Sequence, residues 1–338
     1  MPHLLKLEDI HSLMEDIKLD SKVNNFKERQ INLFDYYFED ERDLSNEYLN
    51  IDSIPEVVVK GFSIVDFKPE NIVGIDTSSF KLGDTDLGYI AVLRGSIVSI
   101  GKSNKIIRLG PYVIHITYDN ALDIINTLRL KLGLESISIN QLPSFNKILD
   151  RVRNYFERFL QLYSVAVYRR SIILFDGSLM GGTVDTPVKL MNSICRYADS
   201  SESILIGISK SSTLRYTDGR PITSLLPSFI VGYIDVYNGI SRSVRNKVFG
   251  RVYVARFSAE GDSLRVDVYP GVYHNYEYCL NAFYHNASFV RGYPNILLLA
   301  HKHSVFRKLD VIATKAYITK YAGSIYGGGS REYILPRY

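Results

Sequence analysis

The stretch SIILFDGSLMGG, residues 171–182, joins a short apolar run to a polar turn. Residues 171–175 have the composition of a strand that is buried on both faces of a sheet. The strand ends at Asp176, whose charge is costly to remove from water. Because Asp-Gly is also common turn chemistry, Asp176 either starts a turn or belongs to a functional site at the carboxyl end of a central strand.

The composition is that of a globular protein with material for a large core. The chain has 338 residues, of which 46% are hydrophobic and 22% charged. Its two cysteines, Cys195 and Cys279, have neither metal-site nor disulfide-framework spacing, which indicates a reducing compartment. No apolar run approaches the length of a membrane span, and the first residues are too charged for a signal peptide. We therefore expect a soluble, cytoplasmic protein with no membrane partner.

The charge is spread unevenly along the chain. Residues 1–60 hold 7 Lys and Arg against 14 Asp and Glu, a net charge of −7. Residues 205–260 hold 8 against 3, a net charge of +5. This asymmetry indicates either a polyanionic partner for the basic segment or scattered solubilising charge.

The order of apolar patterns predicts an α/β fold with a mixed sheet. Helical spacing predicts an N-terminal helical region, residues 1–60, followed by one domain, residues 61–338. The expected elements of that domain are β-rich runs between 71 and 118, helices at 120–135 and 143–170, the strand ending at Asp176, a helix near 186–197, a strand at 203–210, a β-rich insertion at about 213–275, and a strand and long helix at 293–323. Antiparallel strands followed by βα units are the ribonuclease-H-like arrangement, a mixed sheet flanked by helices.

Two strands of this expected sheet end in the same way. The run VGIDTSS carries Asp76 and the run LFDGSL carries Asp176, and small or hydroxyl residues follow each acid. If the strands are neighbours, both carboxylates lie at one edge of the sheet. Clustered carboxylates without cysteine suit oxygen-preferring cations such as Mg²⁺ or Mn²⁺.

Three further residues are candidates for the same site. Glu157 lies beside the apolar stripe of a helix, where it is either solvated or aimed at a partner. Lys210 ends an apolar strand, so its ammonium could bind a phosphate or pair with a carboxylate. His301 follows the apolar run 297–300 at an expected strand-to-helix switch, where it could ligate a metal, carry a proton or be structural.

Five motifs then carry a family resemblance. In order they are GIDTSS, LFDGSL, GISKSS, RVDVYPG and GYPNILLLAHK. Together they resemble the NurA family of archaeal DNA-repair nucleases, whose ribonuclease-H-like core is related to the Piwi domain of Argonaute. The family's catalytic residues map to Asp76, Glu157, Asp176, Lys210 and His301. Thr77 departs from the glycine usual after the first acid, which can tighten or rotate that turn.

The resemblance implies a metal-dependent DNA nuclease. One or two Mn²⁺ (or Mg²⁺) ions would be held by Asp76, Glu157, Asp176 and His301, while Lys210 would offset charge on the scissile phosphate. Family members act as 5′-to-3′ exonucleases and single-strand endonucleases, form homodimers, and work with the hexameric HerA helicase in DNA end resection for double-strand break repair.

The basic segment is the expected DNA path. Its candidate phosphate ligands are Lys210, Arg215, Arg220, Arg242 and Arg245. Tyrosines of the same segment either stack on single-stranded bases or belong to the core; they are Tyr216, Tyr233 and Tyr237.

Two other functions stay open on the sequence. GIDTSS also resembles the first phosphate loop of actin-like ATPases and sugar kinases, and SIYGGGS at 324–330 resembles their adenosine-side glycines. Only eight residues follow Ser330, too few for the helix that such a loop precedes. The other alternative is a non-catalytic paralogue that binds DNA, an interpretation that Thr77 keeps open.

Overall fold

The computed structural model describes residues 6–17, 27–28, 49–51, 58–212, 214–216 and 219–321. Its strands are β1 (Lys27–Glu28), β2 (Leu49–Ile51), β3 (Asn71–Asp84), β4 (Gly88–Gly101), β5 (Lys105–Thr117), β6 (Ile172–Asp176), β7 (Ile204–Ser209), β8 (Leu214–Tyr216), β9 (Gly232–Asp235), β10 (Arg251–Arg256), β11 (Leu264–Tyr269), β12 (Phe289–Val290) and β13 (Tyr293–Pro294). Its α-helices are α1 (Leu7–Asp16), α2 (Ala121–Lys131), α3 (Ile148–Val167), α4 (Val188–Ser200), α5 (Arg242–Arg245), α6 (Tyr276–Asn286), α7 (Asn295–Ser304) and α8 (Lys308–Tyr321).

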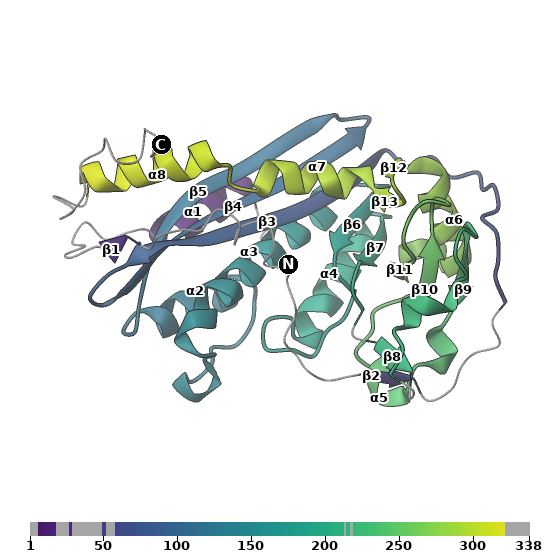
Figure 1. Cartoon of the computed structure of the whole chain (residues 1–338), viewed down its shortest axis with the longest axis horizontal. Coiled ribbons are helices and arrows are strands. Elements are labelled where there is room, and N and C mark those ends of the chain that lie inside the picture. The colour runs from purple at the N-terminus through teal and green to yellow at the C-terminus, as the bar shows by residue number, and fades with distance from the viewer. Residues whose placement is uncertain are drawn as a thin grey trace, which may run out of the picture.

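A nine-stranded mixed sheet runs through the molecule (Figure 1). Its strands follow the order β5-β4-β3-β6-β7-β11-β10-β9, and β1 pairs with the far end of β3. β3, β4 and β5 are antiparallel, whereas β6 and β7 run parallel to β3. This order and these directions confirm the ribonuclease-H-like mixed sheet expected from the sequence.

The basic segment extends the sheet on the side of β7. β11 pairs antiparallel with β7, and β10 and β9 continue outward from it. In this segment β8 leaves the sheet, to form a separate parallel pair with β2. The residues expected as a β-rich insertion therefore share the backbone hydrogen bonding of the core. The division of the chain at residue 60 stays a prediction.

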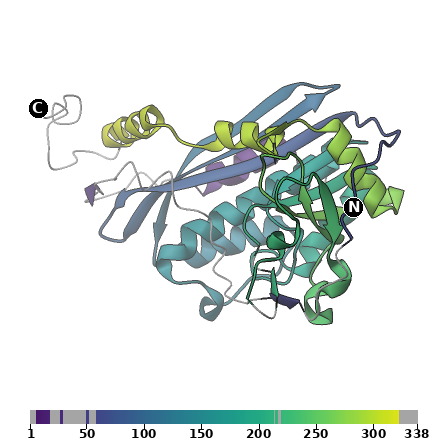
Figure 2. The same cartoon turned by 45° about the vertical axis from the view of Figure 1, so that its right-hand side comes forward.

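Helices cover both faces of the sheet, and the alternation of side chains along each strand separates two cores. In β6, Ile173 and Phe175 pack in one core with α2, α3 and α4. Ile172 and Leu174 point the other way and pack in a second core with α6 and α7. Figures 1 and 2 show α7 and α8 along one side of β3 and β4, with α2 and α3 on the other side.

The prediction of a strand near residue 296 is wrong, because the run NILLLA begins helix α7. Its buried residues are Ile296, Leu297, Ala300 and Ser304, which recur at the three- and four-residue spacing of one helical face. An apolar run of four to six residues fits a buried strand or a buried helix equally well, so periodicity alone cannot separate them.

The N-terminal region is described only in part. α1 confirms a helix there, and it packs Ile10, Leu13 and Met14 into the core beside α3. The rest of the expected N-terminal helices and the glycine run 324–330 lie outside the described residues. Cys195 and Cys279 are buried and unbonded to each other. Among the described helices, none has the length and apolarity needed to cross a membrane.

Candidate active site at the end of strand β6

Two aspartates meet where β6 leaves the sheet. Ile75 of β3 pairs with Phe175 of β6, so Asp76 and Asp176 are the next residues of adjacent parallel strands. Asp176 has the side-chain direction of Leu174, toward α7. Asp76 faces the same helix, since it contacts His301 and Ser304. The structure therefore brings both carboxylates to one point, as the matching strand ends predicted.

Helix α7 supplies two partners for Asp76. The Ser304 hydroxyl donates a hydrogen bond to Asp76 Oδ2. His301 Nδ1 lies 3.3 Å from the same oxygen, and the histidine side chain is 62% exposed. The hydrogen bond to Asp76 raises the pKa of His301 and outweighs the lowering effect of burial and of Lys210. The His301 ring is thus held beside the Asp76 carboxylate, and one side of the ring is open to solvent.

Asp176 is a carboxylate in an unfavourable place. Burial raises its pKa, and the charge of Asp76 raises it further. The Lys210 ammonium, a hydrogen bond from Tyr293 and the charge of His301 act in the opposite direction without cancelling the rise. Lys210 Nζ lies 4.2 Å from the centre of the Tyr293 ring, which holds the ammonium by a cation–π contact.

Glu157 lies elsewhere. The Thr77 hydroxyl donates to Glu157 Oε2 at 3.2 Å, and Gln161 Nε2 donates to Oε1 at 2.8 Å. Thr77 follows Asp76 in β3, so its side chain points to the opposite face of the sheet, where α3 packs. Glu157, a residue of α3, thus lies on the α3 side of the sheet, whereas the two aspartates face α7. Thr77, the departure from the family pattern, is one of the two residues that hold it there.

The donor chemistry of the site fits a divalent cation. Asp76 and Asp176 offer hard oxygen ligands and His301 a nitrogen ligand, a set that suits Mn²⁺ or Mg²⁺. A cation would also relieve the repulsion that raises the pKa of Asp176. In the part of the chain that the structure describes, however, no three His, Cys, Asp or Glu side chains already surround a common point.

Comparison with known proteins identifies the segment that carries this site. A family model, the NurA domain, matches residues 70–232. This segment is similar to the NurA domain. It includes Asp76, Glu157, Asp176 and Lys210, whereas His301 lies beyond its end. A search of curated proteins gives no match.

Solved structures show more distant likenesses. The NurA nuclease from Sulfolobus solfataricus is 15% identical, with 78% of this chain and 88% of that chain covered and a TM-score of 0.47. A NurA crystallised with manganese is 13% identical, with 78% and 91% covered and a TM-score of 0.44. Endonuclease V from Ciona intestinalis, in complex with inosine-containing DNA, is 15% identical, with 73% and 87% covered and a TM-score of 0.37.

A buried ion pair outside the matched NurA segment anchors the turn after Asp176. Arg265 and Asp267 are 2% and 0% exposed, and the guanidinium donates to both carboxylate oxygens at 2.7 and 2.8 Å. Asp267 Oδ2 also accepts the backbone N–H of Leu179 at 2.9 Å. The motif RVDVYPG contributes to the family resemblance, but the sequence predicts no role for its two charged residues. The available signal was two opposite charges two residues apart, on one face of an otherwise apolar strand.

Gly207, in the segment that the NurA model matches, lets the same turn lie close to the sheet. A Cβ atom at Gly207 would approach the carbonyl oxygen of Gly177 to 2.7 Å. The Gly177 N–H donates to the Ile208 carbonyl at 2.7 Å. Together with Asp267, these contacts fix the backbone for three residues beyond Asp176.

Two of the basic residues expected to bind DNA lie near this turn. Arg242 and Arg245 belong to the short helix α5. The residues just after α5 hydrogen-bond to the turn, because the Phe249 N–H donates to the Leu179 carbonyl and the Gly181 N–H donates to the Lys247 carbonyl. The binding of Arg242 and Arg245 to DNA stays a prediction.

The two other arginines of that set, Arg215 and Arg220, lie beside β8, whereas Lys210 lies over Tyr293. Arg215 Nη1 donates to the Gly219 carbonyl, and Arg215 forms an isolated β-bridge with Pro221, the neighbour of Arg220. Tyr216 and Tyr233 are buried and cannot stack on bases. Tyr237 is partly buried beneath the guanidinium of Arg245.

Proposed function

We propose that this NurA-domain protein is a metal-dependent DNA nuclease whose chemistry takes place at Asp76 and Asp176. The observation that carries the proposal is the pair of adjacent carboxylates, one of them buried with a raised pKa, beside an ammonium and an imidazole. Strongly perturbed groups that converge on one point are typical of catalytic sites. The matched NurA domain supports phosphodiester cleavage as the reaction.

Each residue has a proposed task. Asp76 and Asp176 hold the divalent cation, Mn²⁺ or Mg²⁺, with His301 as a further ligand. One or two such ions supply Lewis-acid activation of water and of the scissile phosphate. Lys210, exposed above Tyr293, binds a phosphate oxygen and offsets charge that develops in the transition state. Ser304 orients the Asp76 carboxylate through its hydrogen bond.

Glu157 is the proposed third carboxylate. It is tied to Thr77 and Gln161, so joining the site requires both hydrogen bonds to break. The same hydrogen bonds favour a second candidate function, a non-catalytic DNA-binding protein in which Glu157 never reaches a metal.

The finer assignment follows the family motifs. We place the protein in the cytoplasm as a homodimer that acts with the HerA helicase in DNA end resection, with 5′-to-3′ exonuclease and single-strand endonuclease activity. The proposed DNA contacts are Lys210, Arg215, Arg220, Arg242 and Arg245. The resemblance of GIDTSS, LFDGSL and GISKSS to that family supports this assignment.

A cleavage assay separates the two candidate functions. Labelled single- and double-stranded DNA is incubated with the wild-type protein, with and without Mn²⁺ or Mg²⁺. We expect metal-dependent cleavage that Asp76→Asn nearly abolishes and that Asp123→Asn, a change on the exposed surface of α2, leaves intact. DNA binding without cleavage under either metal would favour the non-catalytic protein.

A further inference from the structure

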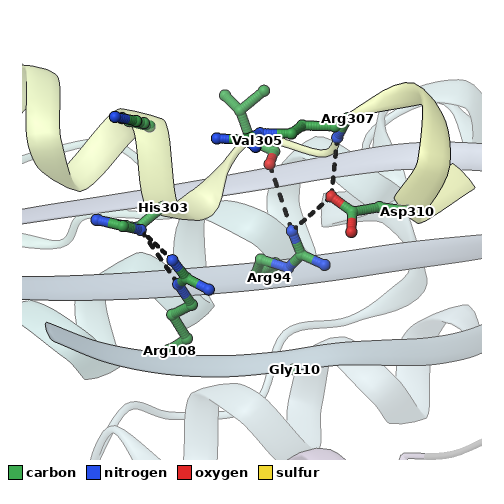
Figure 3. A pocket seen from close by; sticks show the side chains of 8 residues that line it. Arg94, Arg108, Gly110, His303, Val305, Arg307 and Asp310 are labelled. Carbon is green, nitrogen blue, oxygen red and sulfur yellow. Dashed lines mark hydrogen bonds and ion pairs between the residues drawn. The ribbon is translucent and has the colours of Figure 1, made fainter.

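A basic pocket of about 300 Å³ lies where α7 passes into α8 (Figure 3). Arg94 comes from β4 and Arg108 from β5, while Lys302, His303 and Arg307 come from α7 and the turn after it. Asp310 is the acidic residue of the lining. The two strand arginines and the α7 residues are far apart in sequence, so only the fold assembles them.

The pocket shares a face of the sheet with the proposed active site. Asp76 pairs with Ser96 in β4, and Ser96 pairs with Arg108 in β5. Residues paired directly across strands point to the same face. Arg108 therefore lies two strands from Asp76 on the α7 side, at roughly 10 Å given a strand spacing of about 4.8 Å.

Helix α7 connects the two locations. His301 contacts Asp76 on one flank, and His303 Nδ1 accepts a hydrogen bond from Arg108 Nε at 3.2 Å on the other. Residues two apart on a helix point about 200° away from each other. An extended ligand that passes the end of α7 at Ser304 would reach both.

The pocket has more positive charge than its own carboxylate can neutralise. Arg94 donates to Asp310 at 3.1 Å and to the Val305 carbonyl at 3.3 Å, so it is the cation that pairs with the carboxylate. Four cations against one carboxylate leave a net charge of +3. Lys302 and Arg307 are exposed and form no ion pair with another described residue.

We propose that this pocket binds a backbone phosphate of the nucleic-acid strand that is cut, a few nucleotides from the scissile bond. The inference rests on the proposed nuclease function and adds a second contact point to it. Guanidinium groups bind phosphate through paired N–H donors. Arg108 is exposed, and the His303 ring contacts its guanidinium from one side. Such a contact fixes the position of the strand without reading its sequence.

The test compares oligonucleotide binding by two double variants. Arg108→Ala with Arg307→Ala removes two exposed cations of the pocket. Arg196→Ala with Lys131→Ala removes two exposed cations from α4 and α2, on the other face. Binding of a fluorescent single-stranded oligonucleotide is followed by anisotropy in EDTA over a range of salt, so that no cleavage occurs.

We expect the pocket variant to bind roughly tenfold more weakly at low salt, which corresponds to the removal of one charge-assisted hydrogen bond. Its log–log salt slope should fall by about 0.7, the value for one phosphate of a single strand. The control variant should bind like wild type, and thermal melting should show that both are folded.

Each other outcome overturns the pocket proposal. Normal oligonucleotide binding by the pocket variant, with wild type binding and cleaving DNA, refutes the pocket alone. A wild-type protein that neither binds nor cuts nucleic acid refutes the nuclease function as well. Tight binding of AMP that needs Arg108 assigns the pocket to a free nucleotide. Loss of poly-glutamate binding with unchanged oligonucleotide binding assigns it to an acidic protein segment.

Discussion

Removal of Asp267 tests whether the buried ion pair positions the turn after Asp176. In Asp267→Leu, the Arg265 guanidinium stays buried without its carboxylate, and the Leu179 N–H has no acceptor. Removing one partner of a buried ion pair lowers the free energy of unfolding by about 3–5 kcal/mol. An unsatisfied backbone N–H adds about 1–3 kcal/mol. Since total stability is on the order of 5–15 kcal/mol, this single variant should be close to unfolding.

The double variant Arg265→Met, Asp267→Leu separates stability from position. Replacing both charges by apolar groups of similar volume is often neutral or stabilising, by about 1–4 kcal/mol. Only the unpaired Leu179 N–H then remains as a cost. The free energy of unfolding of the double variant should therefore lie within about 3 kcal/mol of the wild-type value. We still expect slower DNA cleavage, because the turn that follows Asp176 loses the hydrogen bond between Leu179 and Asp267.

Urea unfolding followed by circular dichroism gives the free energies, and single-turnover cleavage gives the rates. Asp235→Asn is the matched control, since it breaks the partly exposed ion pair with Arg251 on β9 and β10 without touching Leu179. Full cleavage by the folded double variant would refute the positioning role. A destabilisation below about 1 kcal/mol in Asp267→Leu would refute the assumption that the pair is buried and intact.

Three further predictions test the site. Asp176→Asn should abolish cleavage yet raise the melting temperature of the metal-free protein. Wild type loses stability as pH rises from the ordinary carboxyl pKa to the raised pKa of Asp176, and the variant should not show this loss; thermal melts between about pH 4 and 8 check both. Thr77→Ala should remove one of the two hydrogen bonds that hold Glu157 and tighten Mn²⁺ binding by up to about tenfold, measured by calorimetry, and unchanged affinity would show that Thr77 does not keep Glu157 from the metal. Arg242→Ala with Arg245→Ala should lower the log–log salt slope of single-strand binding by about 0.7 for each phosphate that the variant no longer binds, and an unchanged slope would move the DNA path elsewhere.

The meeting of Asp76 and Asp176 was predictable because it depends on strand direction alone. Two apolar strands that end in an acid, if parallel and adjacent, bring those acids to one edge. The structure has that pairing, with Ile75 opposite Phe175. Helix α7 was not predictable in the same way, since a short apolar run carries too few turns to reveal its period.

The face on which each side chain lies was harder to infer. Glu157 belongs to the expected helix, yet its contact with Thr77 depends on which face of β3 the helix covers. The basic pocket left no sequence signal, because Arg94 is a single charge in an apolar strand and Arg108 is one of only two in the next strand. Their meeting with His303 and Arg307 depends on tertiary packing that no local pattern encodes.

The geometry of α7 limits which insertions and deletions the chain can tolerate. One residue added between Ala300 and Ser304 would turn the helix end by about 100°, which would carry Ser304 away from Asp76 and His303 away from Arg108. A loop residue added after Val305 would leave both contacts in place. Homologous chains that keep this site should therefore vary in length after the helix and hold a constant length within it.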